Sequence, residues 1–284
     1  MHRRTIFIFV VAGLMLSVAA VATIFLPTTV QNTGRHGMHI GPEKWRGTIT
    51  ITGDVLLLGD LSIDPGTTVR FEVGDDQHSG DEVLADGYND NDPTRLLAYG
   101  KTHSNIIVLG KVIAIGSKNA PIIFTSASTT PHLADWEAII FNGDGSIIDS
   151  AVVEYSRNGI NPIGDQSHSM LRHNDIRHTM WGGISSGHSS VRVIDNHISD
   201  CGHEGVDVQG GDQIVRGNVI EDCHAGIVIL GGSPTVENNV IRNAGDDIHV
   251  VAGATPKMSG NTFVPAPPDS SREWRYDNFA YTMY

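Results

Sequence analysis

The stretch Asn218–Leu230, NVIEDCHAGIVIL, decides the fold because the chain repeats it. A near copy, NVIRNAGDDIHVV, follows, and a looser copy, NHISDCGHEGVDV, precedes it. The Asn that opens each copy recurs every 21 or 22 residues, at Asn174, Asn196, Asn218, Asn239 and Asn261. A unit this short cannot bury an apolar face alone, so we expect the copies to stack on one another.

Aligned copies place residues of one kind at one position. Two positions are aliphatic: Val153, Ile176, Ile198, Ile220 and Ile241 form one column, and Ile160, Ile184, Val206, Ile227 and Ile248 the other. A third column is small: Ser156, Thr179, Cys201, Cys223 and Ala244. A fourth alternates in charge: Glu154, Arg177, Ser199, Glu221 and Arg242. Short period-two patches between Gly and Asn turns indicate strands, so the aliphatic columns are predicted to form internal ladders.

The Asn column has a structural explanation. Asn adopts the left-handed backbone conformation of sharp turns readily, and its amide can bond to the next coil. The two cysteines, Cys201 and Cys223, lie one coil apart in the small column. Strand spacing allows a disulfide between them, but buried small fillers are the favoured interpretation.

These repeats resemble the right-handed parallel β-helix proteins of the pectin lyase-like superfamily. ITGDVLLLGDLSIDPGTTVRFE resembles an opening coil of that family, and GKVIAIGSKNAPIIFTS resembles the next one. The resemblance implies an all-β fold, a single right-handed parallel β-helix over residues 42–263. It does not define an activity, because the superfamily contains lyases, hydrolases, epimerases and catalytically silent members.

The chain begins with a basic head, MHRR, followed by a stretch without charge from Thr5 to Leu26. Residues 1–26 are therefore predicted to form a hydrophobic helix, either a transmembrane anchor or a cleaved signal peptide. Both alternatives place the body outside the cytoplasm. Residues 27–41 read as a polar linker. The formal net charge of −13 argues against nucleic acid as a partner.

Two segments fall outside the coils. An acidic loop at 74–95 contains closely spaced carboxylates, of which Asp86, Asp90 and Asp92 are candidate calcium ligands. The alternative is a solvated acidic loop. The tail, 264–284, is rich in aromatic residues, namely Trp274, Tyr276, Phe279 and Tyr281. We expect these to cap the last coil or pack along its flank. An aromatic sugar-binding platform is the rival interpretation.

One turn carries a row of side chains that stacking brings together. His203, Glu204, Asp207 and His224 should lie within one coil spacing of each other. Imidazole beside carboxylate suits acid–base chemistry, and the same set can hold a cation. A solvated polar edge is the competing interpretation.

The motifs of catalytic superfamily members are largely missing. Asp246 and Asp247 resemble the Asp pair of polygalacturonase-like hydrolases, but the chain has no Asn-Thr-Asp triplet and no Arg-Ile-Lys. The leading hypothesis is an exported or membrane-anchored protein that binds polysaccharide or cell-envelope glycan, or serves as an envelope scaffold. The alternative is an enzyme acting on a uronate-type glycan, a lyase, hydrolase or epimerase.

Overall fold

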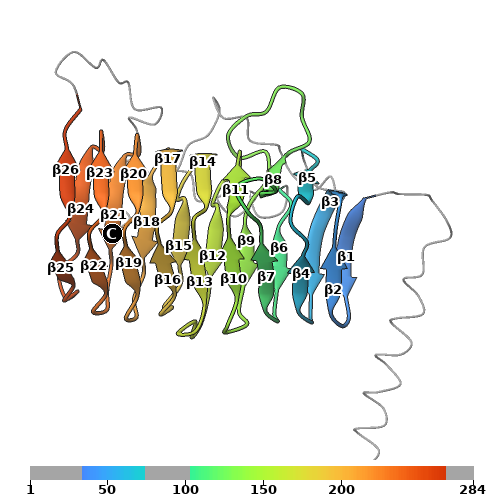
Figure 1. Cartoon of the computed structure of the whole chain (residues 1–284), viewed down its shortest axis with the longest axis horizontal. Coiled ribbons are helices and arrows are strands. Elements are labelled where there is room, and N and C mark those ends of the chain that lie inside the picture. The colour runs from blue at the N-terminus through green and yellow to red at the C-terminus, as the bar shows by residue number, and fades with distance from the viewer. Residues whose placement is uncertain (1–33, 74–102, 267–284) are drawn as a thin grey trace, which may run out of the picture. The chain divides into compact units, whose positions relative to one another are not determined.

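The computed structural model describes residues 34–73 and 103–266 (Figure 1). Three predictions concern residues outside these ranges. They are the helix over residues 1–26, the calcium ligands of the acidic loop, and the placement of the aromatic residues of the tail. Within the described residues, no helix is long and apolar enough to cross a membrane.

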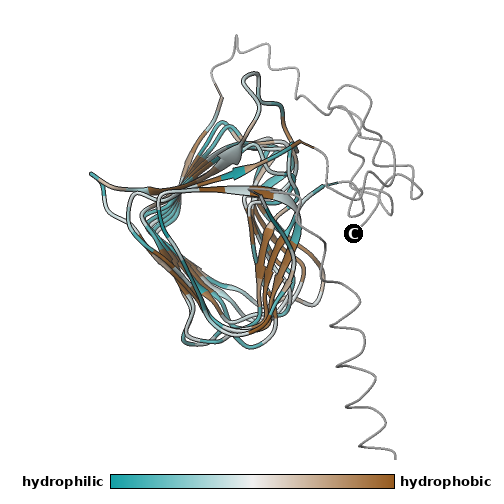
Figure 2. Ribbon diagram, turned by 90° about the vertical axis from the view of Figure 1, so that its right-hand side faces the viewer, coloured by the Kyte–Doolittle hydropathy of each residue, from teal (hydrophilic) through white to brown (hydrophobic). Residues whose placement is uncertain are grey.

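The described part is a parallel β-solenoid of about nine turns. Each coil contributes strands to three faces, which enclose the core as a triangle when viewed along the stack (Figure 2). Face 1 and face 2 join in one 17-stranded sheet, and face 3 is a separate 9-stranded sheet. They join because β3 (Thr48–Leu57) pairs with β5 through its first half and with β6 through its second.

The other strands follow in a regular order. Face 1 contains β5 (Thr68–Phe71), β8 (Ile122–Ser126), β11 (Ala151–Glu154), β14 (Asp175–Thr179), β17 (His197–Cys201), β20 (Val219–Glu221), β23 (Val240–Arg242) and β26 (Thr262–Val264). Face 2 contains β1 (Arg35–His39), β6 (Ile106–Val108), β9 (Ile139–Phe141), β12 (Ile160–Pro162), β15 (Ile184–Ser186), β18 (Glu204–Val208), β21 (Ala225–Ile229) and β24 (Asp246–Val250). Face 3 contains β2 (Glu43–Trp45), β4 (Leu61–Ile63), β7 (Val112–Ile115), β10 (Ile147–Asp149), β13 (Met170–Arg172), β16 (Arg192–Ile194), β19 (Ile214–Arg216), β22 (Thr235–Glu237) and β25 (Lys257–Ser259).

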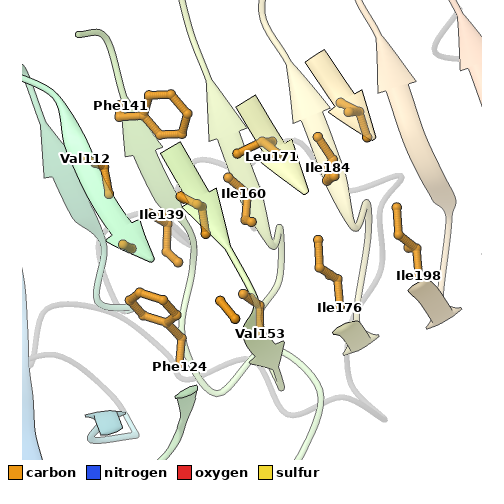
Figure 3. Close-up of a cluster of buried hydrophobic side chains, with 14 of the residues drawn as sticks. Val112, Phe124, Ile139, Phe141, Val153, Ile160, Leu171, Ile176, Ile184 and Ile198 are labelled. Carbon is orange, nitrogen blue, oxygen red and sulfur yellow. The ribbon is translucent and has the colours of Figure 1, made fainter. Parts of the chain in front are cut away.

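The core consists of the predicted aliphatic ladders. Ile176 pairs with Val153 and Ile198, and Ile184 pairs with Ile160 and Val206. All six side chains are fully buried. Figure 3 shows five of them, Val153, Ile160, Ile176, Ile184 and Ile198, among the buried hydrophobic side chains of the core. Equivalent aliphatic side chains of neighbouring coils pack against each other, so each coil offers the next one an apolar surface of the same shape.

The Asn ladder is also present. Asn196 donates from its backbone N and from Nδ2 to Oδ1 of Asn218, at 2.9 and 3.0 Å, and its Nδ2 also donates to the carbonyl of Leu171. The expectation of a left-handed backbone at the Asn is wrong, however. The positive φ falls on the residue before it, such as Asp195 (φ 52°) or Gly217 (φ 68°). The turn is made one residue earlier, so that the Asn amide can point inward and satisfy backbone groups of two coils.

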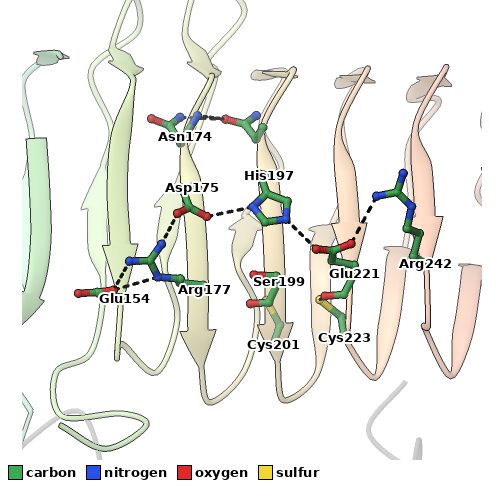
Figure 4. Close-up of polar contacts among 11 residues, drawn as sticks. Glu154, Asn174, Asp175, Arg177, His197, Ser199, Cys201, Glu221, Cys223 and Arg242 are labelled. Carbon is green, nitrogen blue, oxygen red and sulfur yellow. Dashed lines mark hydrogen bonds and ion pairs between the residues drawn. The ribbon is translucent and has the colours of Figure 1, made fainter. Parts of the chain in front are cut away.

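The predicted charge column lies on the outer side of face 1 (Figure 4). Arg177 contacts Glu154 at 2.8 Å, and Arg242 contacts Glu221 at 3.5 Å. His197 joins two coils, with Nδ1 3.1 Å from Asp175 and Nε2 3.0 Å from Glu221. Burial lowers the pKa of His197, but its hydrogen bonds to the two carboxylates outweigh this and raise it.

Two details refine the predicted boundaries and the cysteines. Strand pairing begins at Arg35, inside the segment predicted as a linker, because β1 pairs with β3 and closes the edge of the first coil. Cys201 and Cys223 are buried free thiols, as favoured. Burial raises the pKa of Cys223, which keeps this thiol protonated.

Candidate functional site on face 2

A column of glycines turns the chain from face 1 into face 2: Gly159, Gly183, Gly205 and Gly226. A Cβ on Gly205 would lie 2.4 Å from Cγ2 of Ile220 and 2.9 Å from the carbonyl oxygen of Gly226. The residue therefore faces the core and leaves no room for a side chain. Because Gly205 and Val206 both face inward, Glu204 and Asp207 on either side of them face outward.

A second glycine makes space beside these carboxylates. Gly182 aligns with Glu204 one coil earlier, and a Cβ there would lie 3.1 Å from Oε1 of Glu204 and 2.5 Å from Oγ of Ser185. The carboxylate of Glu204 thus leans across the neighbouring coil into the place that a side chain at position 182 would fill. Gly182, Ser185 and Glu204 define a position on face 2 that we call the Gly182 site.

The predicted row of His203, Glu204 and His224 comes together here. His203 Nδ1 is in contact with Oε2 of Glu204. The rings of His203 and His224 meet edge to face, with centroids 5.8 Å apart. Burial lowers the pKa of His203 to about 4, and the neighbouring His224 adds to this effect. His203 is therefore a neutral imidazole at neutral pH, in contact with a carboxylate.

Asp207 lies on the same strand, and Gln209 is its neighbour. Nε2 of Gln209 donates to Oδ2 of Asp207 at 2.7 Å. Burial raises the pKa of Asp207 to about 6, while the bond from Gln209 opposes the rise. A carboxyl group of this kind is partly protonated near neutral pH and can donate as well as accept.

The polar row continues toward the N-terminal coils. The guanidinium of Arg157 lies 4.1 Å from the ring centre of Trp181, and its Nη1 lies 2.5 Å from Oε1 of Glu137. Burial raises the pKa of Glu137, and Arg157 opposes the rise. In the aligned repeats, Arg157 and Trp181 occupy the positions of His203 and His224, whereas Glu137 and Gln209 belong to no repeated column.

Several outer oxygens of face 2 have no hydrogen-bond donor among the described residues: Oε2 of Glu137, Oδ1 of Asn161 and Oδ1 of Asp207. All three are buried acceptors, and a buried acceptor without a donor costs about 1–3 kcal/mol. A row of such acceptors is suited to a partner that brings hydroxyl or amide hydrogens.

The remaining candidate residues are the acidic pair Asp246 and Asp247 with the nearby His249, and the predicted metal ligands. His249 lies 3.1 Å from Asp246, and burial together with Asp246 raises the pKa of Asp247. Across residues 34–73 and 103–266, no group of three or more His, Cys, Asp or Glu side chains is arranged to hold a metal ion. The candidate calcium ligands Asp86, Asp90 and Asp92 lie outside that range, so calcium binding there stays a prediction.

Comparison with known proteins supports the architecture. Residues 132–263 match the family model described as the right handed beta helix region. Searches of curated proteins and of solved structures gave no match. The part of the chain that carries the Gly182 site is therefore a right-handed parallel β-helix, in agreement with the resemblance seen in the repeats.

Proposed function

We propose that this right-handed β-helix binds a polysaccharide along face 2, centred on the Gly182 site. The observation that carries the proposal is the row of outer acceptors on this face, among them Oδ1 of Asp207 and Oδ1 of Asn161, which have no donor from the described residues. A polysaccharide carries several hydroxyl groups, and these can donate hydrogen bonds to acceptors at different positions along the face. The fold supports this assignment by analogy only; the acceptors are the physical argument.

The charges on the face narrow the class of glycan. Arg157 is paired with Glu137 and stacked on Trp181, so it is held rigidly. An aromatic ring beside a fixed cation suits a sugar ring with a polar edge. The carboxylates Glu204 and Asp207 add negative charge, which favours neutral sugars, or uronates only where a cation lies between the charges.

A specific observation favours a second function, turnover of the glycan. His203 is a neutral base with a pKa of about 4, and Asp207 is a weak acid with a pKa of about 6, on the same strand pair. Two groups whose environments push their pKa values apart are the elements of acid–base catalysis. In this reading His203, Glu204 and His224 form the base side, and Asp207 supplies the proton.

The experiment that separates the two functions is a screen of the full chain on neutral and acidic polysaccharides, with and without calcium. Binding is followed by retention on immobilised glycan, and turnover by new reducing ends and unsaturated uronate absorbance. We expect retention without turnover. Retention should fall at least tenfold in Glu204→Gln and remain unchanged in Glu221→Gln, a matched carboxylate on the outer side of face 1.

Two results decide against this proposal. Turnover that is abolished by His203→Ala and by Glu204→Ala would establish the enzyme instead. No retention on any polysaccharide would contradict both functions. The calcium arm also tests the acidic loop, since a gain that disappears in Asp90→Asn assigns the cation to Asp86, Asp90 and Asp92. Export of the body, through residues 1–26 as anchor or signal, remains part of the proposal because an envelope glycan lies outside the cytoplasm.

A further inference from the structure

The coil register brings the outer oxygens of face 2 together around the Gly182 site. Ser185 pairs with Asp207 of the next coil, and the pairing of β12 with β15 places Asn161 beside Ser185 on the other side. Neighbouring coils lie about 4.8 Å apart, so these three residues form a short outward row, which we call the acceptor row. Oγ of Ser185 and Oε1 of Glu204 both lie beside Gly182, 2.5 and 3.1 Å from a Cβ there.

The acceptor row lacks hydrogen-bond donors. Oδ1 of Asn161 and Oδ1 of Asp207 have no donor among the described residues. The other oxygen of Asp207 accepts from Gln209 at 2.7 Å, so the single donor in reach is already used. A buried acceptor without a donor costs free energy, which the N–H or O–H of a ligand recovers.

The charge around the acceptor row is negative. Glu204 and Asp207 are both buried, and strands β12, β15, β18 and β21 contain no lysine or arginine. Arg157 lies on this side of the solenoid, but its guanidinium is paired with Glu137 at 2.5 Å and offsets that acid. Burial raises the pKa of Asp207 to about 6, as expected of a carboxyl group without a nearby positive charge.

We propose that the sugar bound at the Gly182 site is an amino sugar, whose free ammonium group lies over Ser185 between Asp207 and Asn161. This inference rests on the proposed function, because it names the sugar that face 2 binds. An ammonium group donates up to three hydrogen bonds and supplies the positive charge that the two carboxylates lack. A neutral sugar brings donors without charge, and a uronate adds a further negative charge.

The site is open enough for such a group and selective for its charge. Ser185 and Asn161 are partly exposed, and the short side chain of Ser185 leaves room above the acceptor row. An N-acetyl group would replace the ammonium by a neutral amide with one N–H and would add bulk. We therefore expect the site to discriminate between free and acetylated amino sugars.

Two oligosaccharides that differ only at the nitrogen test this inference in the full chain. They are the β-1,4-linked tetramer of glucosamine and its fully N-acetylated counterpart. Each is titrated calorimetrically at pH 6.5 and physiological ionic strength, with a chelator present to exclude divalent cations. We expect the glucosamine tetramer to bind at least tenfold more tightly than the acetylated one.

A control for net charge is needed, because the formal charge of −13 attracts any cationic oligomer. Asp207→Asn and Asp175→Asn remove the same charge, the first from face 2 and the second from the outer side of face 1. We expect Asp207→Asn to weaken binding of the glucosamine tetramer at least tenfold and Asp175→Asn to leave it unchanged. Glu204→Gln is a second face 2 variant and should weaken binding in the same direction.

The outcomes separate this inference from the proposed function. Equal affinity for the two tetramers, or equal losses in Asp207→Asn and Asp175→Asn, would overturn the amino sugar. Retention of a neutral or acidic polysaccharide without binding of either tetramer would also overturn it, and would leave polysaccharide binding in place. Absence of binding to the tetramers and to every polysaccharide would contradict both.

Discussion

Face 1 and face 2 are built from the same repeats but present opposite outer surfaces. On face 1, outward charges meet opposite charges one coil away, as in the chain from Asp175 through His197 to Glu221. On face 2, outward charges are buried, and oxygens such as Oδ1 of Asp207 have no donor among the described residues. Face 1 pairs its own outward charges, whereas face 2 leaves several outer oxygens without a donor from the described residues. Stacking of the repeats therefore stabilises the fold but does not determine the chemistry of each outer face.

The largest effect is expected from removing the bend that makes the faces differ. Gly205→Ala forces a Cβ to within 2.4 Å of Ile220 and 2.9 Å of the carbonyl oxygen of Gly226. The backbone must shift, and we expect a loss of about 3 kcal/mol or more in the free energy of unfolding. Urea denaturation followed by circular dichroism measures it.

Gly187→Ala is the matched control for this change. A Cβ at Gly187 meets nothing closer than Cγ2 of Ile163, at 3.4 Å, and the residue has no positive φ. We expect less than about 1 kcal/mol, since surface substitutions without a named conflict have small effects. A similar loss in both variants would show that the inward glycine column has no special role.

The next effect concerns the buried carboxylate of face 2. The pKa of Asp207 rises from 3.8 to about 6 on folding, so this group favours the folded state below pH 3.8 and loses that contribution as pH rises through 6. A difference of this size corresponds to about 3 kcal/mol. Asp207→Asn keeps an acceptor for Gln209 without the charge. The variant should gain stability over the native protein at pH 8 and gain little at pH 4.

Stability curves for both proteins between pH 4 and pH 8 measure this difference. His203 is common to both proteins, so its own titration cancels in the comparison. A difference that stays constant with pH would contradict the buried charge at Asp207.

The smallest effect belongs to face 1. His197 has a raised pKa, so its contribution is present below pH 6.5 and is lost as pH rises through the folded value. His197→Gln should lower the melting temperature at pH 5 and leave it unchanged at pH 9. We expect under about 1 kcal/mol, because the side chain is partly exposed and solvent screens the pairs. A larger loss at pH 9 than at pH 5 would be inconsistent with the bridge.

The sequence predicts most of the fold because the fold is periodic. Residues such as Ile198 and Ile220 can be aligned from the sequence alone. Because both are aliphatic, the alignment predicts which strand residues pair and that their side chains are buried. The Asn ladder follows by the same reasoning, although the left-handed residue precedes it. The role of Gly205 is harder to predict, because a glycine in a turn-rich repeat has many explanations. Only the structure shows that a side chain at this position would collide with Ile220.

The candidate site is predicted only in part for a related reason. His203, Glu204 and His224 lie in aligned positions of neighbouring repeats. Stacking of the repeats therefore predicts the proximity that the structure shows. Gln209 and Glu137 have no counterparts in the other repeats. Their contacts with Asp207 and Arg157 become known only from the structure. The burial of Asp207 has no sequence signature at all, because outward residues of a strand are expected to meet water.

The most direct test compares the two faces in one binding measurement. Glu204→Gln with Asp207→Asn neutralises the outer acids of face 2, and Asp175→Asn with Glu221→Gln does the same on face 1. The dissociation constant for the polysaccharide best retained by the full chain is measured for each double variant. We expect at least a tenfold weaker affinity for the face 2 variant and no change for the face 1 variant. Equal losses, or a loss on face 1 alone, would contradict it.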